Sequence, residues 1–392
     1  MPDSARHPHQ ELDLQVALGP ALIATSGFAA SNVGATYARA RALAEQLDRP
    51  EYLVSLLYGE WAFHCIRPNH RLALSLAEQL ERTGRARNDV TALLLGHFAH
   101  GTTCMFLGEF VTARALFEQC EGMSDPVRRS VYVAVTGTDQ YLAMLSELGY
   151  ILSCLGYLEQ GRARISDALL SARRFGHANT LAYVLLYACM IDLLGGSARE
   201  LAQHAEELIA LSNEHGFALW LGWATILYGQ SLIAVGKVEE GLLMQTNALS
   251  TIRATGAEIG IAPILCYRAA AYAKLGRLAE GLNLVAEAAQ IIESANERYR
   301  EAEIHRWQGD LLNDTGDEAA AEQSYHRALA VSRRQSAKLH ELRAAASLGR
   351  LWRHQGKHTE ARNLVAPIYR SFTEGFDTPV LRDAKALLDQ LT

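Results

Sequence analysis

His97, His100 and Cys104 are the residues whose types and spacing come nearest to a metal site. Separations of three and four residues would put their side chains on one face of a helix. Imidazole nitrogen and thiolate sulfur are ligands that zinc and other soft metals accept. No carboxylate or fourth ligand accompanies them at a recognisable spacing. We therefore expect no metal site, and a structural role with one histidine packed and one exposed to solvent.

Motifs for nucleotide binding and hydrolysis are incomplete. The Gly-Lys pairs at 236–237 and 356–357 resemble the end of a phosphate-binding loop, but Ser231 and Leu351 occupy the place of its first glycine. Neither pair is followed by Ser or Thr. The sequence also contains no G-x-S-x-G elbow and no H-E-x-x-H helix. We expect no catalytic residues and no cofactor, and hence no enzyme; an enzyme with an unrecognised site is the alternative.

Glycines recur along the chain at intervals of forty residues, each between two stretches of apolar residues with helical periodicity. They are Gly156, Gly196, Gly236, Gly276, Gly316 and Gly356. A fixed period of this size is typical of stacked repeat proteins. Each unit of such a stack buries its apolar face only against its neighbours. The sequence therefore predicts one continuous solenoid rather than several globular domains.

The clearest unit covers residues 300–335. Gly309, Ala321 and Ala328 are small enough to let the two helices of a hairpin approach closely, and Tyr325 would fill the space beside them. Gly316 supplies the turn. These offsets return in other units and resemble the tetratricopeptide repeat, although its usual unit has 34 residues. The resemblance implies an all-α fold, a right-handed superhelix of helical hairpins.

We divide the chain into four parts. Residues 1–9 are expected to form a disordered tail, and 10–48 an irregular helical hairpin that turns at Gly27. Residues 52–376 are expected to form the tetratricopeptide-like solenoid of about eight hairpins, with an inserted loop near residues 122–126. A capping helix over 378–392 would begin at Thr378 and Pro379, an N-cap and a first-turn proline.

A closer resemblance lies in the segments 11–25 and 372–379 and in the run 222–351. These resemble the C-terminal repeat region of bacterial signalling proteins that join a class III adenylate or guanylate cyclase domain to a STAND-type ATPase domain. The cyclase and ATPase domains of that family would precede residue 1, so the resemblance brings neither activity to this chain. It implies a non-catalytic signal-transduction module that binds a protein or peptide, such as a cyclase or ATPase domain.

The resemblance to tetratricopeptide repeats implies that the first helix of each hairpin lines the concave face. Matching the repeat offsets places apolar side chains there in the earlier repeats: Tyr58, Phe98, Met105, Tyr150, Leu185, Met190, Trp223 and Ile226. An exposed trough of this kind would bind a peptide, an amphipathic helix or a flat small molecule, so a small-molecule receptor is an alternative function. The other interpretation is that long helices close the coil and these residues pack together as core.

Three arginines of the last repeat, Arg343, Arg350 and Arg353, have helical spacing that would place them on one face. Such a face could hold an acidic peptide or a phosphate group. An outward stripe of solvated charge is the alternative interpretation.

Composition and charge limit the partners further. A net charge of −6 over 392 residues does not provide the excess of positive charge that nucleic-acid binding usually needs. Six cysteines stand singly, which is typical of buried thiols in a reducing cytoplasm. The longest apolar stretch, residues 181–191, is shorter than the roughly 20 residues that span a bilayer. We expect a cytoplasmic protein that contacts neither nucleic acid nor membrane.

Overall fold

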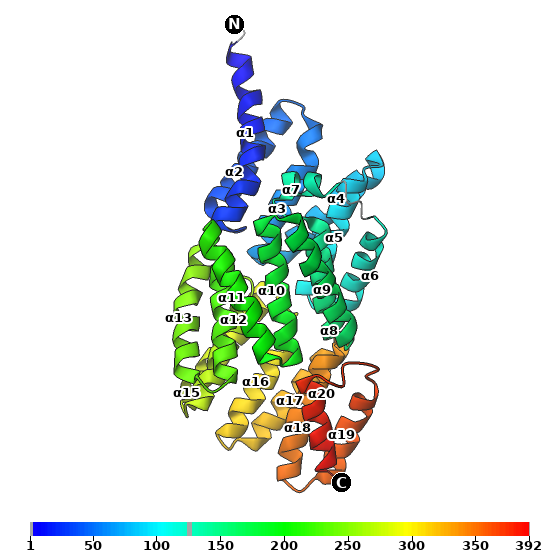
Figure 1. The fold of residues 1–392 in the computed structure, drawn as a ribbon, viewed down its shortest axis with the longest axis vertical. Helices are drawn as coiled ribbons and strands as arrows, with labels where there is room; N and C mark the ends of the chain where they lie inside the picture. The colour runs from blue at the N-terminus through cyan, green and yellow to red at the C-terminus, as the bar shows by residue number, and fades with distance from the viewer. Residues whose placement is uncertain (1–2, 124–127, 392) are drawn as a thin grey trace.

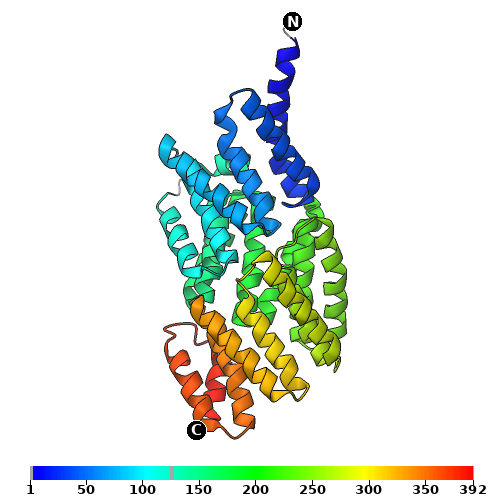
Figure 2. The ribbon, with the colours of Figure 1, turned by 180° about the vertical axis from the view of Figure 1, so that it is seen from behind.

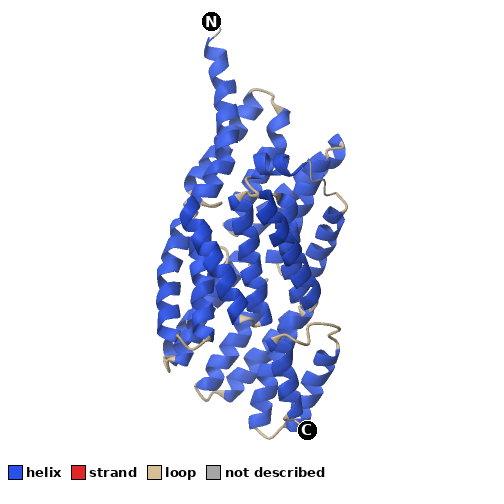
Figure 3. Ribbon diagram, in the orientation of Figure 1, coloured by secondary structure: helices blue, strands red, loops and turns tan. Residues whose placement is uncertain are grey.

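The structure is a computed structural model that describes residues 3–123 and 128–391, and these residues form helices joined by short turns without any strand (Figures 1 and 3). The N-terminal hairpin and the short helix after it are α1 (Asp3–Ser26), α2 (Ser31–Gln46) and η1 (Pro50–Tyr52). The first solenoid hairpins are α3 (Leu53–Ile66) with α4 (His70–Arg87) and α5 (Val90–Phe106) with α6 (Phe110–Glu121).

A short helix, α7 (Arg129–Thr136), precedes the remaining hairpins. These are α8 (Gln140–Cys154) with α9 (Leu158–Phe175), α10 (Ala178–Gly195) with α11 (Ala198–His215), α12 (Ala218–Ala234) with α13 (Val238–Ala254), α14 (Ile261–Lys274) with α15 (Leu278–Ala295), α16 (Glu301–Asp314) with α17 (Glu318–Arg334), and α18 (Lys338–His354) with α19 (His358–Arg370). The last helix is α20 (Pro379–Asp389). The prediction of an all-α solenoid with eight hairpins is confirmed over the described residues.

At intervals of twenty residues, a residue with left-handed backbone conformation follows the end of a helix. From the centre to the C-terminal part these residues are Gly156, Gly176, Gly196, Gly216, Gly236, Gly256, Gly276, Asn296, Gly316, Ser336 and Gly356. Glycine adopts this conformation without the steric cost that a side chain brings. The forty-residue glycine period of the sequence thus marks the turns within hairpins, and the turns between hairpins use the same geometry at the half period.

Both predicted ends of the chain can be compared with the structure. Residues 3–9, expected in a disordered tail, form the beginning of α1, where Arg49 contacts His9 at 2.9 Å and Arg39 binds Glu11 at 2.6 Å. Residues 1 and 2 lie outside the described part. The capping helix α20 starts as predicted, with Thr378 accepting a hydrogen bond from the Leu381 N–H. The expected inserted loop near 122–126 falls partly outside the described residues, and α7 after it was not expected.

The coil closes on itself, because segments about five hairpins apart in the chain are joined by backbone hydrogen bonds (Figures 1 and 2). The Ile66 carbonyl, at the end of α3, accepts from the N–H groups of Glu258 and Ile259, before α14. The Phe106 carbonyl, at the end of α5, accepts from Arg298 and Tyr299, before α16, at 2.8 and 3.1 Å. The first helices of the hairpins therefore face an enclosed interior.

A third link closes the C-terminal end. Glu374, in the linker before α20, accepts hydrogen bonds from the N–H groups of Glu159 and Gln160 at 3.0 and 3.1 Å. Glu159 in turn accepts from the Gly375 N–H at 2.9 Å. The first N–H groups of a helix have no partner within the helix, so the Glu374 carboxylate caps α9 from a distant part of the chain.

Candidate functional site

A cavity of about 120 Å³ lies inside the coil and is our candidate functional site. Its wall comes mainly from the first helices of successive hairpins, α3, α5, α10, α12 and α14, and from the linkers before α14 and α16. The aromatic lining residues are Phe28, Tyr58, Trp61, Phe98, Phe106, Tyr183, Tyr187, Trp220, Trp223, Tyr267 and Tyr299. The polar side chains in the wall are Thr102, Thr138, Gln140 and Arg300. A mostly apolar wall with a few polar groups is typical of small ligand sites.

The structure brings together half of the apolar residues that the sequence placed on the concave face. Tyr58, Phe98, Met190 and Trp223 line the cavity. The other four residues are fully buried in the core and do not line it: Met105, Tyr150, Leu185 and Ile226. These eight side chains thus form no exposed trough, because the coil closes tightly enough for most of them to pack on one another. The cavity remains where that packing is incomplete.

The three predicted arginines do not share one exposed face. Arg350 is exposed and Arg353 is partly buried, whereas the Arg343 side chain points into the coil. Its guanidinium donates to Glu303 at 3.0 Å and to the carbonyl oxygens of Leu193 and Leu194 at 3.2 and 2.7 Å. Arg343 therefore joins α18 to the end of α10, and the prediction of a common anion-binding face is wrong for this residue.

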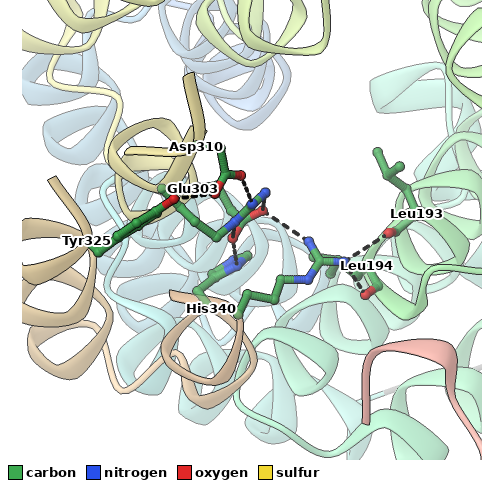
Figure 4. Close-up of polar contacts among 8 residues, drawn as sticks. Leu193, Leu194, Glu303, Asp310, Tyr325 and His340 are labelled. Carbon is green, nitrogen blue, oxygen red and sulfur yellow. Dashed lines mark hydrogen bonds and ion pairs between the residues drawn. The ribbon is translucent and has the colours of Figure 1, made fainter. Parts of the chain in front are cut away.

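Glu303 is the centre of a buried charged cluster (Figure 4). Arg306 donates to it at 3.0 and 3.1 Å, and His340 lies 3.7 Å away. Figure 4 also shows Asp310 and Tyr325 beside the cluster, joined by a hydrogen bond of 2.9 Å. Burial alone would raise the pKa of the Glu303 carboxyl, but Arg306, Arg343 and His340 hold that pKa well below its usual range. The cluster is a matched set of charges that packs the later repeats together.

Arg300 is a buried cation without such a match. Its residue is 3% exposed, and its guanidinium lies 5.5 Å from the ring centre of Tyr150 and 5.8 Å from that of Tyr299. Within the described residues no hydrogen bond or ion pair reaches the guanidinium, and its buried Nε has no partner. The sequence analysis missed Arg300 because it lies in the linker before α16, outside the helical offsets that were compared between repeats.

The glutamates nearest to Arg300 in sequence bind elsewhere. Glu297 accepts hydrogen bonds from the Gly260 N–H at 3.0 and 3.1 Å. Glu301 pairs with Arg334 at 3.1 Å, and Glu303 belongs to the charged cluster. The positive charge of Arg300 therefore faces aromatic rings and the cavity rather than a carboxylate.

Glu147 is a second polar residue that the sequence analysis missed. It lies on α8 and is fully buried, accepting hydrogen bonds from Tyr183 and, at 2.7 Å, from Thr102. Burial raises the pKa of this carboxyl to about 7, although those hydrogen bonds act in the opposite direction. Burial likewise raises the pKa of Glu297 to about 8. The only sequence signal for Glu147 was a single charge within the apolar run of residues 142–152.

The histidine and cysteine group serves packing. His97 and His100 both contact Glu81, at 3.3 and 2.9 Å, so the carboxylate that sequence spacing did not reveal comes from the preceding helix. Burial raises the pKa of Glu81, but the two histidines lower it well below its usual range. Cys104 is buried, and the residues described contain no cluster of metal-ligating side chains.

Helix α10 has the length and apolar composition of a membrane span, and it alone does so among the helices that the structure describes. However, 67% of this segment is buried within the coil, where it forms part of the cavity wall. Such burial is typical of a core helix.

No family model and no curated protein matches this chain. Solved structures do match. A Rap protein complexed with competence and sporulation factor aligns with a TM-score of 0.63 at 10% identity, over 98% of this chain and all of the other. NprR in complex with its cognate peptide NprX aligns at 0.50 and 11% identity, over 76% of this chain and 82% of that chain.

A STAND-type signal transduction ATPase from Pyrococcus horikoshii, which carries a tetratricopeptide repeat sensor, matches at a TM-score of only 0.41, with 14% identity over 91% of this chain and 54% of that chain. This match is too low to carry an argument, and these matches give no support to the cyclase relationship. At 10–11% identity the two better matches show a common fold. The chain has the helical-repeat solenoid fold of tetratricopeptide-like proteins.

Proposed function

We propose that this chain is a non-catalytic regulatory module that binds a peptide or protein partner in the cytoplasm. The observation that carries this proposal is the aromatic cavity inside the coil. The fold of the coil matches the full length of a Rap protein that was solved with a factor bound. The Rap protein was solved with its factor and NprR with its peptide, and both share this architecture. Six unpaired, buried cysteines support the cytoplasmic location.

Binding without turnover would act through the closure of the coil. The cavity wall joins α3 and α5 to α12, α14 and the linker before α16, so a bound ligand would contact segments from two ends of the repeat array. A ligand that binds only the closed form stabilises it by mass action. The proposed effector, on the strength of the sequence resemblance alone, is a cyclase or ATPase domain that docks on the closed coil.

Tryptophan fluorescence tests this proposal directly, because Trp61, Trp220 and Trp223 line the cavity. Titration with pools of short synthetic peptides is expected to give a saturable change and a higher melting temperature for one pool. Trp223→Phe should reduce the signal, whereas Trp352→Phe, outside the cavity, should preserve it. A flat response to every pool would contradict peptide binding.

The cavity volume favours a small-molecule receptor as the second candidate. A cavity of about 120 Å³ is close to the engineered cavity of about 150 Å³ that holds benzene. In that case a metabolite library would give the saturable signal, and the peptide pools would give none.

A further inference from the structure

The interior cavity contains a buried guanidinium and a buried amide oxygen that lack partners. The Nε atom of Arg300 and the Oε1 atom of Gln140 are both inaccessible to solvent and make no hydrogen bond. Both residues line the same cavity. Buried polar groups are almost always hydrogen-bonded, and a buried charge without a counter-charge is costlier still. The charge of Arg300, which no carboxylate of the described residues neutralises, therefore needs an explanation.

The aromatic rings satisfy Arg300 only in part. Tyr150 and Tyr299 offer their faces to the guanidinium, which is a favourable contact for a cation. A ring face does not replace the in-plane oxygen acceptors that a guanidinium fork fits, and a carboxylate offers two such oxygens in the matching geometry. The remaining donors of Arg300 thus fit an anionic group that enters the cavity.

The rest of the wall limits what can accompany that anion. Trp61, Phe98 and Trp223 are apolar neighbours, and the volume suits one ring or a short alkyl chain. The wall supplies one cation, so a single negative charge is neutralised, while a doubly charged phosphate would keep an excess charge in an apolar site.

We infer that the cavity binds an apolar carboxylate, with the carboxylate on the Arg300 guanidinium and the apolar body among the tryptophans. This inference rests on the proposed function, because both place the ligand inside the coil. The carboxylate has two sources, a free small acid or the C-terminal residue of a peptide, and Arg300 would recognise both by the same chemistry.

The test compares matched acids and amides. Phenylacetate carries one ring and a carboxylate, and phenylacetamide lacks only the charge. Titration followed by tryptophan fluorescence and calorimetry should show the acid binding the wild-type chain at least tenfold more tightly than the amide. Arg300→Met should remove this preference, and Arg350→Met, which changes an exposed arginine, should retain it.

The source is distinguished by phenylacetate and the tripeptide Ala-Ala-Phe, each compared with its amide. Tighter binding of phenylacetate would assign a free acid, and tighter binding of the tripeptide would assign a peptide end. Equal affinity for acid and amide, no binding of either, or a preference that persists in Arg300→Met would each overturn the inference. Should Arg300→Met fail to fold, Arg300→Lys keeps the charge without the fork and is expected to weaken the preference.

The peptide pools separate this inference from the proposed function. A pool that binds wild type and Arg300→Met equally would leave the proposed function standing and overturn the carboxylate site. A carboxylate preference without binding of any peptide pool or of the tripeptide would support the site and contradict the peptide partner.

Discussion

Two arginines, the half-buried Arg343 and the buried Arg300, show how differently two regions of the coil are filled. Arg343 in the later repeats is surrounded by acceptors, with Glu303 and two backbone carbonyls satisfying its guanidinium. Arg300, beside the aromatic cavity, is even more buried and has no acceptor among the described residues. A buried charge with partners holds the fold together, whereas one without partners is a cost that a ligand can remove. The first region is architecture, and the second is the proposed site.

The largest expected effect on stability comes from replacing Arg343. Arg343→Met would leave Glu303 with one cation fewer and leave two carbonyls unsatisfied, so we expect the free energy of unfolding to fall by about 3–5 kcal/mol. Chemical denaturation measures it. Arg350→Met on the same helix is the control and should change stability by less than about 0.5 kcal/mol. Equal effects of the two substitutions would remove the basis of the comparison.

Beside the cavity, the contribution of Glu147 to the free energy of unfolding should depend on pH. The pKa of Glu147 is raised from 4.5 to about 7, so its favourable protonated form is fully present below pH 4.5. That stability is lost as the pH rises through 7, by about 3 kcal/mol. Glu147→Gln has no proton to lose, so its stability should decline less than that of the wild type between pH 4.5 and 8. Parallel profiles of the denaturation midpoints would contradict this.

The closure of the coil is tested at Glu374. Its carboxylate caps α9 from outside the helix, and removing an N-cap costs about 1 kcal/mol. Glu374→Ala should lower stability by that amount and increase hydrogen exchange at Glu159 and Gln160. Unchanged exchange at these two amides would mean that the link contributes nothing in solution.

The smallest expected effect on stability is that of Arg300→Met. Loss of the ring contacts opposes relief of the buried charge, so the free energy of unfolding should change by less than about 1 kcal/mol. Thermal and chemical denaturation check it beside Arg343→Met. A loss as large as that of Arg343→Met would show that Arg300 is structural too, and the contrast between the regions would disappear.

Much of the fold was predictable because its signals are local. The glycines at the turns within hairpins and the start of α20 at Thr378 both follow from the backbone preferences of single residues. The helical structure of residues 3–9 did not follow, and the contacts that α1 makes there and just after, from His9 to Arg49 and from Glu11 to Arg39, join it to later segments. Composition near an N-terminus says little about such contacts.

The site was predictable only in part. Repeat offsets identified Tyr58, Phe98, Met190 and Trp223, since equivalent positions in stacked hairpins face the same side. They could not identify Arg300, which lies between hairpins, or foresee that Arg343 would turn inward to the end of α10. Both depend on which distant segments meet when the coil closes.

Helix lengths, turns and the order of hairpins are thus encoded in the chain residue by residue, because each depends on neighbours within about one turn of helix. The curvature of the stack, the contact of Ile66 with Glu258 and Ile259, and the interior cavity arise only after the hairpins have packed. Small rotations between successive hairpins add up over the whole array, and their sum decides whether the interior is an open groove or an enclosed site.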